Sequence, residues 1–241
     1  MKKILVTGKT SRFARFLKKE LSNFEVFYPE KKKFNLLNFK QISRYIKKKK
    51  ITHLIHIAGL SRPMNVHDKN ISKSIDLNII GTANIVKSCA DNKVKLIYFS
   101  TNYVYPGISG NYKETDSLKP INNYAWSKLG GEAAVHLYKN SLILRICMTD
   151  YPFVHKKAVS GAFTSFIFNN KVAQIIPYIL NEKGILNIGG IRREIFKFAT
   201  SQANKNIEKI SINKIKNFPK DSSLNINKIR NLIKNKKKII F

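Results

Sequence analysis

The sequence predicts an α/β fold, a Rossmann-like doubly wound parallel sheet followed by a small C-terminal lobe. Three observations indicate this class. Short β-type runs alternate with helical stretches, as in βαβ units. The expected strands are almost wholly apolar, which is typical of strands buried on both faces of a sheet. The first of them ends at Thr7 and passes through Gly8 directly into a helix start.

The first 146 residues are expected to form most of the sheet. The predicted strands are Lys3–Thr7, Glu25–Tyr28, His53–Ile57, Lys95–Ser100 and Leu142–Ile146. The longer segments between them predict helices over Ser11–Leu21, Phe39–Lys48, Ile71–Asn92 and Tyr124–Lys139. Residues 1–146 are therefore predicted to be a dinucleotide-binding Rossmann domain.

Residues 147–241 are expected to supply the last sheet strands and the small lobe. The predicted elements are a helix over Lys171–Leu180, strands at Gly184–Ile188 and near Ile207–Ile212, and a last helix near Ile226–Lys234. We expect the later segments to lie over the C-terminal ends of the strands, where doubly wound folds place their ligands.

The composition excludes several classes of protein. Hydrophobic residues make up 43% of the chain, so a mainly disordered state is not expected. Two cysteines, Cys89 and Cys147, are too few for a disulfide-stapled miniprotein. No apolar run approaches the ~18 residues of a membrane span, and the apolar start is too short for a signal peptide. We therefore expect a reducing, cytoplasmic setting and no membrane partner.

The chain carries a net charge of +31 from 45 lysines and arginines against 14 acidic residues. This excess is almost all lysine and is spread along the chain, whereas arginine, the usual reader of base edges, is scarce. We therefore expect no specific nucleic-acid partner, only weak binding to DNA at low salt. The same charge should attract nucleotides and sugar nucleotides.

The first strand–helix turn has the spacing of a dinucleotide-binding turn. Gly8, Ser11 and Ala14 match Gly-x-x-Gly-x-x-Gly with two glycines replaced, so an ordinary turn remains an alternative. A carboxylate that would hold an NAD ribose is expected at the end of the second strand, and Glu30 is the one candidate. Basic residues lie at both places: Lys9, Arg12 and Lys31 to Lys33. These favour NADP(H), although NAD(H) remains open.

The strongest constellation is Tyr124-Ala125-Trp126-Ser127-Lys128. Residues four apart share one face of a helix, so the phenol of Tyr124 and the ammonium of Lys128 should point into one site. We expect the ammonium to lower the pKa of the phenol and make it a proton donor. Thr101, at the end of an upstream strand, is placed to hydrogen-bond a substrate carbonyl.

These residues resemble the short-chain dehydrogenase/reductase superfamily, and in particular its extended, sugar-nucleotide branch. Other stretches agree in order: Val6-Thr7-Gly8, His56-Ile57-Ala58-Gly59, Asn78 with Gly81-Thr82-Ala83-Asn84, and Gly130-Gly131-Glu132. The stretch from Phe99 to Gly107 is most similar to the dTDP-4-dehydrorhamnose reductase family, as are residues 111–116 and 218–224. The resemblance covers nearly the whole chain.

The resemblance implies a role for each matching residue. Tyr124 would protonate the substrate oxygen while a hydride arrives from the nicotinamide, Lys128 would hold the nicotinamide ribose, and Thr101 would polarise the carbonyl. The implied cofactor-binding residues are Thr7, Gly8, Ser11, Arg12, Phe13, Asn35, Leu36, Ile57, Ala58, Gly59, Tyr124 and Lys128. No metal site is predicted. His56 is expected to be a packed strand-end residue, and Asn78 to be a group that positions its helix.

The implied function is an NAD(P)H-dependent reduction of a 4-keto nucleotide sugar in polysaccharide precursor biosynthesis. A 4-epimerase remains an alternative. A dehydratase does not, because Asn102-Tyr103 replaces the acid pair that follows the threonine in such enzymes. A non-catalytic dinucleotide-binding regulatory subunit is a further alternative, motivated by the replaced glycines and a shortened C-terminal substrate lobe. The resemblance also leaves a homodimer open.

Overall fold

The computed structural model describes residues 1–216 and 218–234 and contains a six-stranded sheet in which every neighbouring pair is parallel. The spatial order is β2 (Glu25–Phe27), β1 (Lys3–Val6), β3 (His53–His56), β4 (Lys95–Thr101), β5 (Ser141–Ile146) and β10 (Gly184–Ile188). The order reverses between β1 and β3, so a switch point lies there. The predicted fold class is confirmed.

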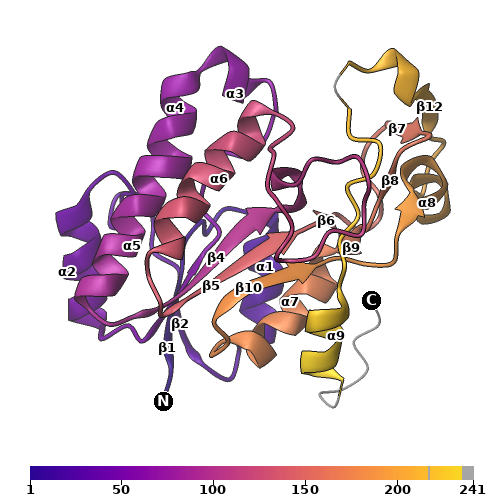
Figure 1. Ribbon diagram of the computed structural model, residues 1–241. Coiled ribbons are helices and arrows are strands. Elements are labelled where there is room, and N and C mark those ends of the chain that lie inside the picture. Colours follow the sequence, from indigo (N-terminus) through magenta and orange to yellow (C-terminus); the bar gives the residue numbers. More distant parts are fainter. Residues whose placement is uncertain (217, 235–241) are drawn as a thin grey trace.

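Helices cover both faces of the sheet (Figure 1). On one face α1 (Arg12–Glu20) packs beside α7 (Asn169–Ile179). On the other, α5 (Gly81–Asp91) packs between α2 (Phe39–Lys49) and α6 (Asn123–His136). The last described helix, α9 (Asn227–Ile233), packs on β10.

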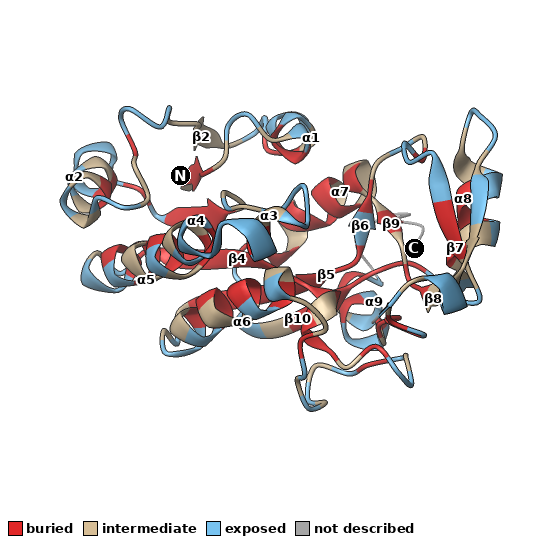
Figure 2. Cartoon of the chain, turned by 90° about the horizontal axis from the view of Figure 1, so that it is seen from above, coloured by how far each residue is buried: buried red, intermediate tan, exposed pale blue. Residues whose placement is uncertain are grey.

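Alternate residues of β1 show how the two faces are filled. Ile4 and Val6 enter the core beneath α1 and α7, whereas Leu5 enters the core beneath α2 and α5. All three are fully buried, which explains why the strand reads as a continuous apolar run. Figure 2 shows the same pattern, with buried positions along the strands and on the inner sides of the helices.

The helix predicted over Ile71–Asn92 is present but not uniform. It starts as α4 (Ile71–Ile75), passes through a π-helical turn, η1 (Asp76–Ile80), and continues as α5. A short helix, α3 (Val66–Lys69), precedes it. The π-helical turn carries the buried residue Asn78, so the irregularity falls at a position that the sequence motif had singled out.

A small lobe lies beyond the C-terminal ends of the sheet strands (Figure 1). It consists of β7 (Lys157–Ser160) paired in parallel with β12 (Glu208–Ser211), β8 (Phe163–Thr164) paired with β11 (Arg193–Glu194), and α8 (Ile195–Gln202). Its core is formed by Phe153, Val159, Ala162, Ile195 and Phe198, among others. The predicted strand near Ile207–Ile212 is β12, and it pairs within the lobe rather than in the main sheet.

Short elements connect the lobe to the sheet. The strands β6 (Met148–Thr149) and β9 (Ile167–Phe168) pair in parallel, and two 3-10 turns, η2 (Asn102–Val104) and η3 (Ile212–Lys214), follow β4 and β12. Within the described residues, no helix is both long enough and apolar enough to span a bilayer.

Candidate active site

A cleft of about 690 Å³ opens at the C-terminal ends of β1 and β3, on the switch point of the sheet. This volume falls within the ~300–1,000 Å³ range of small-ligand and cofactor sites. Eight of the predicted cofactor-binding residues line it: Thr7, Gly8, Ser11, Asn35, Leu36, Ile57, Ala58 and Gly59. Lys9, Glu30 and Lys31, which the sequence singled out for their charge, also line it.

The turn after β1 is tight and requires glycine at its first position. Gly8 has φ +77°, and a Cβ there would lie 3.2 Å from the backbone of Ala58. Ser11, which replaces the second glycine, has φ −68°, so the turn needs no glycine at this position. Its hydroxyl accepts a hydrogen bond from the Ala14 amide at 3.1 Å and caps α1. The serine at this position therefore leaves the backbone of the turn intact.

The Thr7 side chain ties β1 to the end of β3. Its hydroxyl accepts hydrogen bonds from the amides of Ile57 and Ala58, at 3.2 and 3.0 Å, and lies 2.9 Å from Nδ1 of His56. The other ring nitrogen of His56 lies 3.1 Å from the Thr82 hydroxyl. Burial lowers the pKa of His56 to about 3, so the ring is neutral at pH 7. Thr7 lines the cleft, and His56 is buried behind it.

Arg12 and Phe13 point away from the cleft. The Arg12 guanidinium pairs with Asp150 at 2.7 Å, and the Phe13 ring is buried against Phe99, with 5.2 Å between ring centres. The first turn of α1 directs these side chains toward the lobe and the core. Their backbone amides remain the groups that face a ligand at the helix start.

Two side chains of opposite charge lie at the end of the cleft beside the segment that follows β2. The Lys9 ammonium lies 3.0 Å from the Glu30 carboxylate. This hydrogen bond and the charges of Lys9 and Lys33 lower the pKa of Glu30. The Asn35 side chain stabilises its own turn, because its oxygen accepts a hydrogen bond from the Leu37 amide at 3.1 Å.

The three predicted catalytic residues converge beside this cleft. Tyr124 and Lys128 lie in the first two turns of α6, which Asn122 caps by accepting a hydrogen bond from the Ala125 amide at 2.8 Å. Thr101 ends β4, and its hydroxyl is hydrogen-bonded to the Tyr124 phenol. Thr101 and Tyr124 therefore lie side by side, with Lys128 one helical turn further along α6.

The pKa of Tyr124 differs from the expectation. Burial raises it, while the Thr101 hydrogen bond and the charge of Arg62 oppose that rise. Lys128 does not supply the expected lowering, because its Nζ lies over the Tyr98 ring, 4.2 Å from the centre. Burial lowers the pKa of Lys128 to about 7, against the raising influence of Glu132.

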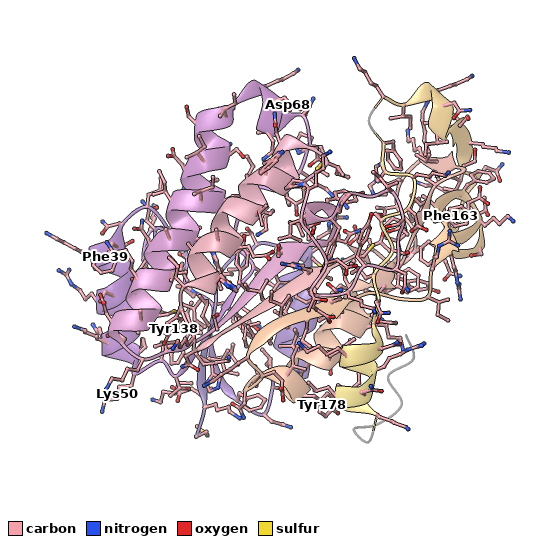
Figure 3. The ribbon with its side chains drawn as sticks, in the orientation of Figure 1. Phe39, Lys50, Asp68, Tyr138, Phe163 and Tyr178 are labelled. Carbon is pink, nitrogen blue, oxygen red and sulfur yellow. The ribbon has the colours of Figure 1, made fainter. Side chains whose placement is uncertain are left out.

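Two residues that the sequence analysis missed lie around Tyr124. The His67 ring lies 5.1 Å from the Tyr124 ring, and its Nδ1 is 2.7 Å from the Ser74 hydroxyl. Arg62, in the same connection after β3, is a cation that acts on Tyr124. No sequence pattern relates this loop to α6. The neighbouring Asp68 accepts a hydrogen bond from Asn123 at 2.7 Å and lies beside the start of α6 (Figure 3).

Asn78 joins the cleft floor to α6. Its side chain exchanges two hydrogen bonds with the Leu60 backbone, at 2.7 and 2.9 Å, and donates a third to the Ser127 hydroxyl at 2.8 Å. A Cβ at Gly59 would lie 2.7 Å from Asn78 Oδ1, so the loop and the side chain fit closely. The expected positioning role of Asn78 extends to the loop beneath the cleft.

Asn102 and Cys147 are occupied by structural contacts. Asn102 donates a hydrogen bond to the Ser222 carbonyl at 3.0 Å. The Cys147 sulfur lies 3.1 Å from the Thr164 hydroxyl, and burial raises the pKa of its thiol to about 11. Both cysteines are free and buried. Within residues 1–216 and 218–234, no group of three or more His, Cys, Asp or Glu side chains could hold a metal ion.

Comparison with known proteins gives matches over most of the chain. Residues 1–151 match the family model described as the RmlD substrate binding domain. Methionine adenosyltransferase 2 subunit beta of Xenopus tropicalis is 30% identical over 186 residues, covering 72% of this chain and 55% of that protein. dTDP-4-dehydrorhamnose reductase of Aggregatibacter actinomycetemcomitans is 27% identical over 154 residues, covering 62% and 52%. The chain thus spans about half the length of the curated relatives it matches.

The fold also matches solved structures. dTDP-4-dehydrorhamnose reductase of Bacillus anthracis, crystallised in complex with NADP, superimposes with a TM-score of 0.85 at 20% identity. The superposition covers 95% of this chain and 92% of that one. The similarity therefore includes the small lobe as well as the sheet.

Proposed function

The chain belongs to the RmlD substrate binding domain family, and we propose that it is an NAD(P)H-dependent reductase of a 4-keto nucleotide sugar, similar to dTDP-4-dehydrorhamnose reductase. The observation that carries the proposal is the cluster of Thr101, Tyr124 and Lys128 beside the cleft at the switch point. Such a cleft in a doubly wound sheet is the expected place for a dinucleotide.

The residues present fit a dinucleotide. Gly8 lets the turn after β1 pass close to the Ala58 backbone, and the start of α1 offers backbone N–H groups to the charge of a pyrophosphate. Ile57, Ala58 and Gly59 form the floor on which the cofactor would rest. Lys128 would hold the nicotinamide ribose. When bound, the nicotinamide supplies the hydride.

Tyr124 supplies the proton in this proposal. Because burial raises its pKa, the phenol remains protonated at neutral pH and can donate to the substrate oxygen as negative charge develops there. When substrate binds, the one O–H proton of Thr101, which faces the phenol in the free protein, would turn to donate to the same oxygen. The two hydroxyl groups then face one carbonyl.

The charges at the end of β2 support NADP(H) over NAD(H). Glu30 would be the acceptor for a ribose diol, but Lys9 pairs with it and lysines follow it. A 2′-phosphate would find Lys9, Lys31 and Lys33 in the same region. We therefore expect tighter binding of NADPH, with NADH as the weaker alternative.

Asn102 argues against a dehydratase reaction. A dehydratase needs an acid after the catalytic threonine, and here an amide binds the Ser222 carbonyl. A 4-epimerase needs only the cluster and a tightly held NAD. Purification of the protein with cofactor already bound would favour that alternative.

A second candidate is a non-catalytic regulatory subunit that binds a dinucleotide. It is favoured by the similarity to methionine adenosyltransferase 2 subunit beta. The cluster of Thr101, Tyr124 and Lys128 favours the enzyme, because a binding module needs no proton donor. In either case we expect a cytoplasmic protein that binds nucleotides, with homodimerisation open.

The decisive experiment measures NADPH oxidation with dTDP-4-dehydro-6-deoxy-L-mannose at moderate salt, for the native protein and for Tyr124→Phe. Turnover that falls by about 10²–10⁴-fold in the variant would support both the reductase and its proton donor. Saturable NADPH binding without turnover would favour another keto sugar or the regulatory subunit. Absence of binding would refute the proposal.

A further inference from the structure

A carboxylate at the entry to the lobe lies between the N-terminal ends of two helices. Asp150 follows β6, and one of its oxygens lies 2.7 Å from Nη1 of Arg12, the first residue of α1. Its other oxygen accepts a hydrogen bond from Nδ2 of Asn169, the first residue of α7, also at 2.7 Å. Neither α1 nor α7, both described in full, has an acidic residue in its own first turn. Asp150 therefore supplies the negative charge that helix N-termini favour.

The two members of this ion pair differ in their freedom to move. The Asp150 side chain is 13% exposed, and its second partner, Asn169, is buried on α7. The Arg12 side chain is 54% exposed and has the long, flexible stem of an arginine. Within the described part of the chain, Asp150 is the carboxylate that pairs with it. If the pair opens, the guanidinium is the group that moves.

Arg12 begins directly after the turn that lines the cofactor cleft. Gly8, Lys9, Thr10 and Ser11 line the cleft, and Ser11 caps the helix that Arg12 starts. A pyrophosphate bound at this helix start would lie within reach of the Arg12 side chain. A guanidinium uses the same planar set of donors for a phosphate and for a carboxylate. While it lies on Asp150 the guanidinium does not line the cleft, so it reaches a phosphate there by leaving the carboxylate.

We propose that Asp150 competes with the pyrophosphate of a dinucleotide for the Arg12 guanidinium and so lowers the affinity of the cleft. The inference rests on the dinucleotide binding that the proposed function requires, but not on turnover. Movement of Arg12 onto the phosphate leaves the Asp150 carboxylate with Asn169 alone. Binding in the cleft therefore loosens a contact between α1 and the entry to the lobe.

An ion pair that stays closed makes the opposite prediction. If Arg12 remains on Asp150, its charge screens the carboxylate from the pyrophosphate. Removal of the carboxylate then matters little while Arg12 is present and more when Arg12 is absent. If the two anions compete, the order reverses, because removal of the carboxylate releases a guanidinium only where there is one to release. A double-mutant cycle separates the two cases.

The first test is such a cycle with Asp150→Asn and Arg12→Gln, measured as the NADPH dissociation constant by fluorescence titration at constant salt. Asp150→Asn should tighten binding by about two- to fivefold, the effect of losing a partly exposed ion pair. The same substitution in the Arg12→Gln protein should tighten binding by less. Both variants are expected to fold, since the asparagine oxygen can still accept from Asn169 and Arg12 lies at the surface.

Glu208→Gln is the matched control for net charge. Glu208 lies on β12 in the lobe and pairs with Lys157 at 2.7 Å, with both side chains more than half exposed. Its substitution removes one negative charge, as Asp150→Asn does, without touching the turn after β1. The NADPH dissociation constant should stay unchanged. Tightening equal to that of Asp150→Asn would assign the effect to overall charge and overturn the proposal.

The second test follows the guanidinium itself. In protein labelled with ¹⁵N at the arginine Nε, the Arg12 signal can be assigned through Arg12→Gln. Before NADPH is added, the Arg12 signals of the native protein and of Asp150→Asn should differ. At saturating NADPH the two signals should coincide, because in both proteins the guanidinium then lies on phosphate. Signals that remain different at saturation would mean that the pair stays closed.

The outcomes separate this inference from the proposed function. A larger effect of Asp150→Asn in the Arg12→Gln protein than in the native one refutes the competition and leaves the reductase proposal standing. Tightening in the expected order without any turnover supports the competition and favours the regulatory subunit. If the native protein binds neither NADPH nor NADH, both proposals fail.

Discussion

The Lys9 ammonium and the Glu30 carboxylate meet at 3.0 Å and join the turn after β1 to the segment after β2. Both side chains are largely exposed, so the pair contributes little to stability. The pair lines the end of the cleft where the adenosine ribose is expected, so we expect it to influence cofactor choice.

Glu30→Gln should therefore increase the preference for NADPH over NADH severalfold. The substitution removes a carboxylate that repels a 2′-phosphate and leaves Lys9 free to bind it. Lys9→Met should act in the opposite direction, because Glu30 then becomes available to a ribose diol. Dissociation constants of both dinucleotides, measured by fluorescence titration, check the prediction. Parallel shifts for the two dinucleotides would contradict it.

The turn after β1 should tolerate a change at Ser11 but not at Gly8. Gly8→Ala places a side chain at φ +77°, which costs roughly 1–2 kcal/mol, and brings it to 3.2 Å from Ala58. We expect a lower unfolding temperature and loss of NADPH binding.

Ser11→Gly is the matched control. It restores the glycine spacing but removes the cap on α1, so we expect a change of only a few tenths of a kcal/mol and no gain in NADPH affinity. Calorimetry and dinucleotide titration of both variants measure the two effects. Tighter binding by Ser11→Gly would show that the replaced glycine had weakened the site.

His56 should make the free energy of unfolding depend on pH. Its pKa is about 3 in the folded protein and near 6.5 in the unfolded chain, so only the unfolded state takes up the proton between these values. Stability is therefore complete above about pH 6.5 and lost as the pH falls. By pH 5 the loss from this residue should be about 2 kcal/mol.

Urea denaturation of the native protein and of His56→Gln at pH 7.5 and pH 5 isolates this effect. The glutamine can still hydrogen-bond Thr7 and Thr82, and it does not titrate. The variant should lose less stability than the native protein between the two pH values. Equal losses would mean that His56 takes up no proton on unfolding in this range.

Arg62 should hold down the pKa of Tyr124. Its charge opposes the effect of burial on the phenol, so Arg62→Leu should raise that pKa further, whereas Arg62→Lys should nearly preserve it. ¹³C NMR of protein labelled at the tyrosine Cζ, with the Tyr124 signal assigned through Tyr124→Phe, measures the shift. A downward shift in Arg62→Leu would be incompatible with this electrostatic role.

Long apolar runs and the helical spacing of Tyr124 and Lys128 carried most of the sequence prediction. The central strands β1, β3, β4 and β5 follow from the apolar runs that burial on both faces imposes. The two-residue strands of the lobe, such as β8 and β11, leave no periodicity to detect, and α8 was missed with them.

Contacts between side chains that lie far apart in the sequence could not be predicted from local patterns. The expected lowering of the Tyr124 pKa by Lys128 is not found, because the lysine ammonium lies over the ring of Tyr98 on β4. The approach of Arg62 and His67 to Tyr124 depends on the path of a loop after β3. Arg12 could be recognised as a cation of the turn, but not as the partner of Asp150.

The course of the chain has a consequence for cooperativity. After β5 it enters the lobe, returns for α7 and β10, enters the lobe again and returns for α9. A fragment ending at residue 146 would lack β10 and would expose the side of α1 that α7 covers. No single cut in the chain separates the sheet from the lobe. The two should therefore unfold together in one transition rather than in two.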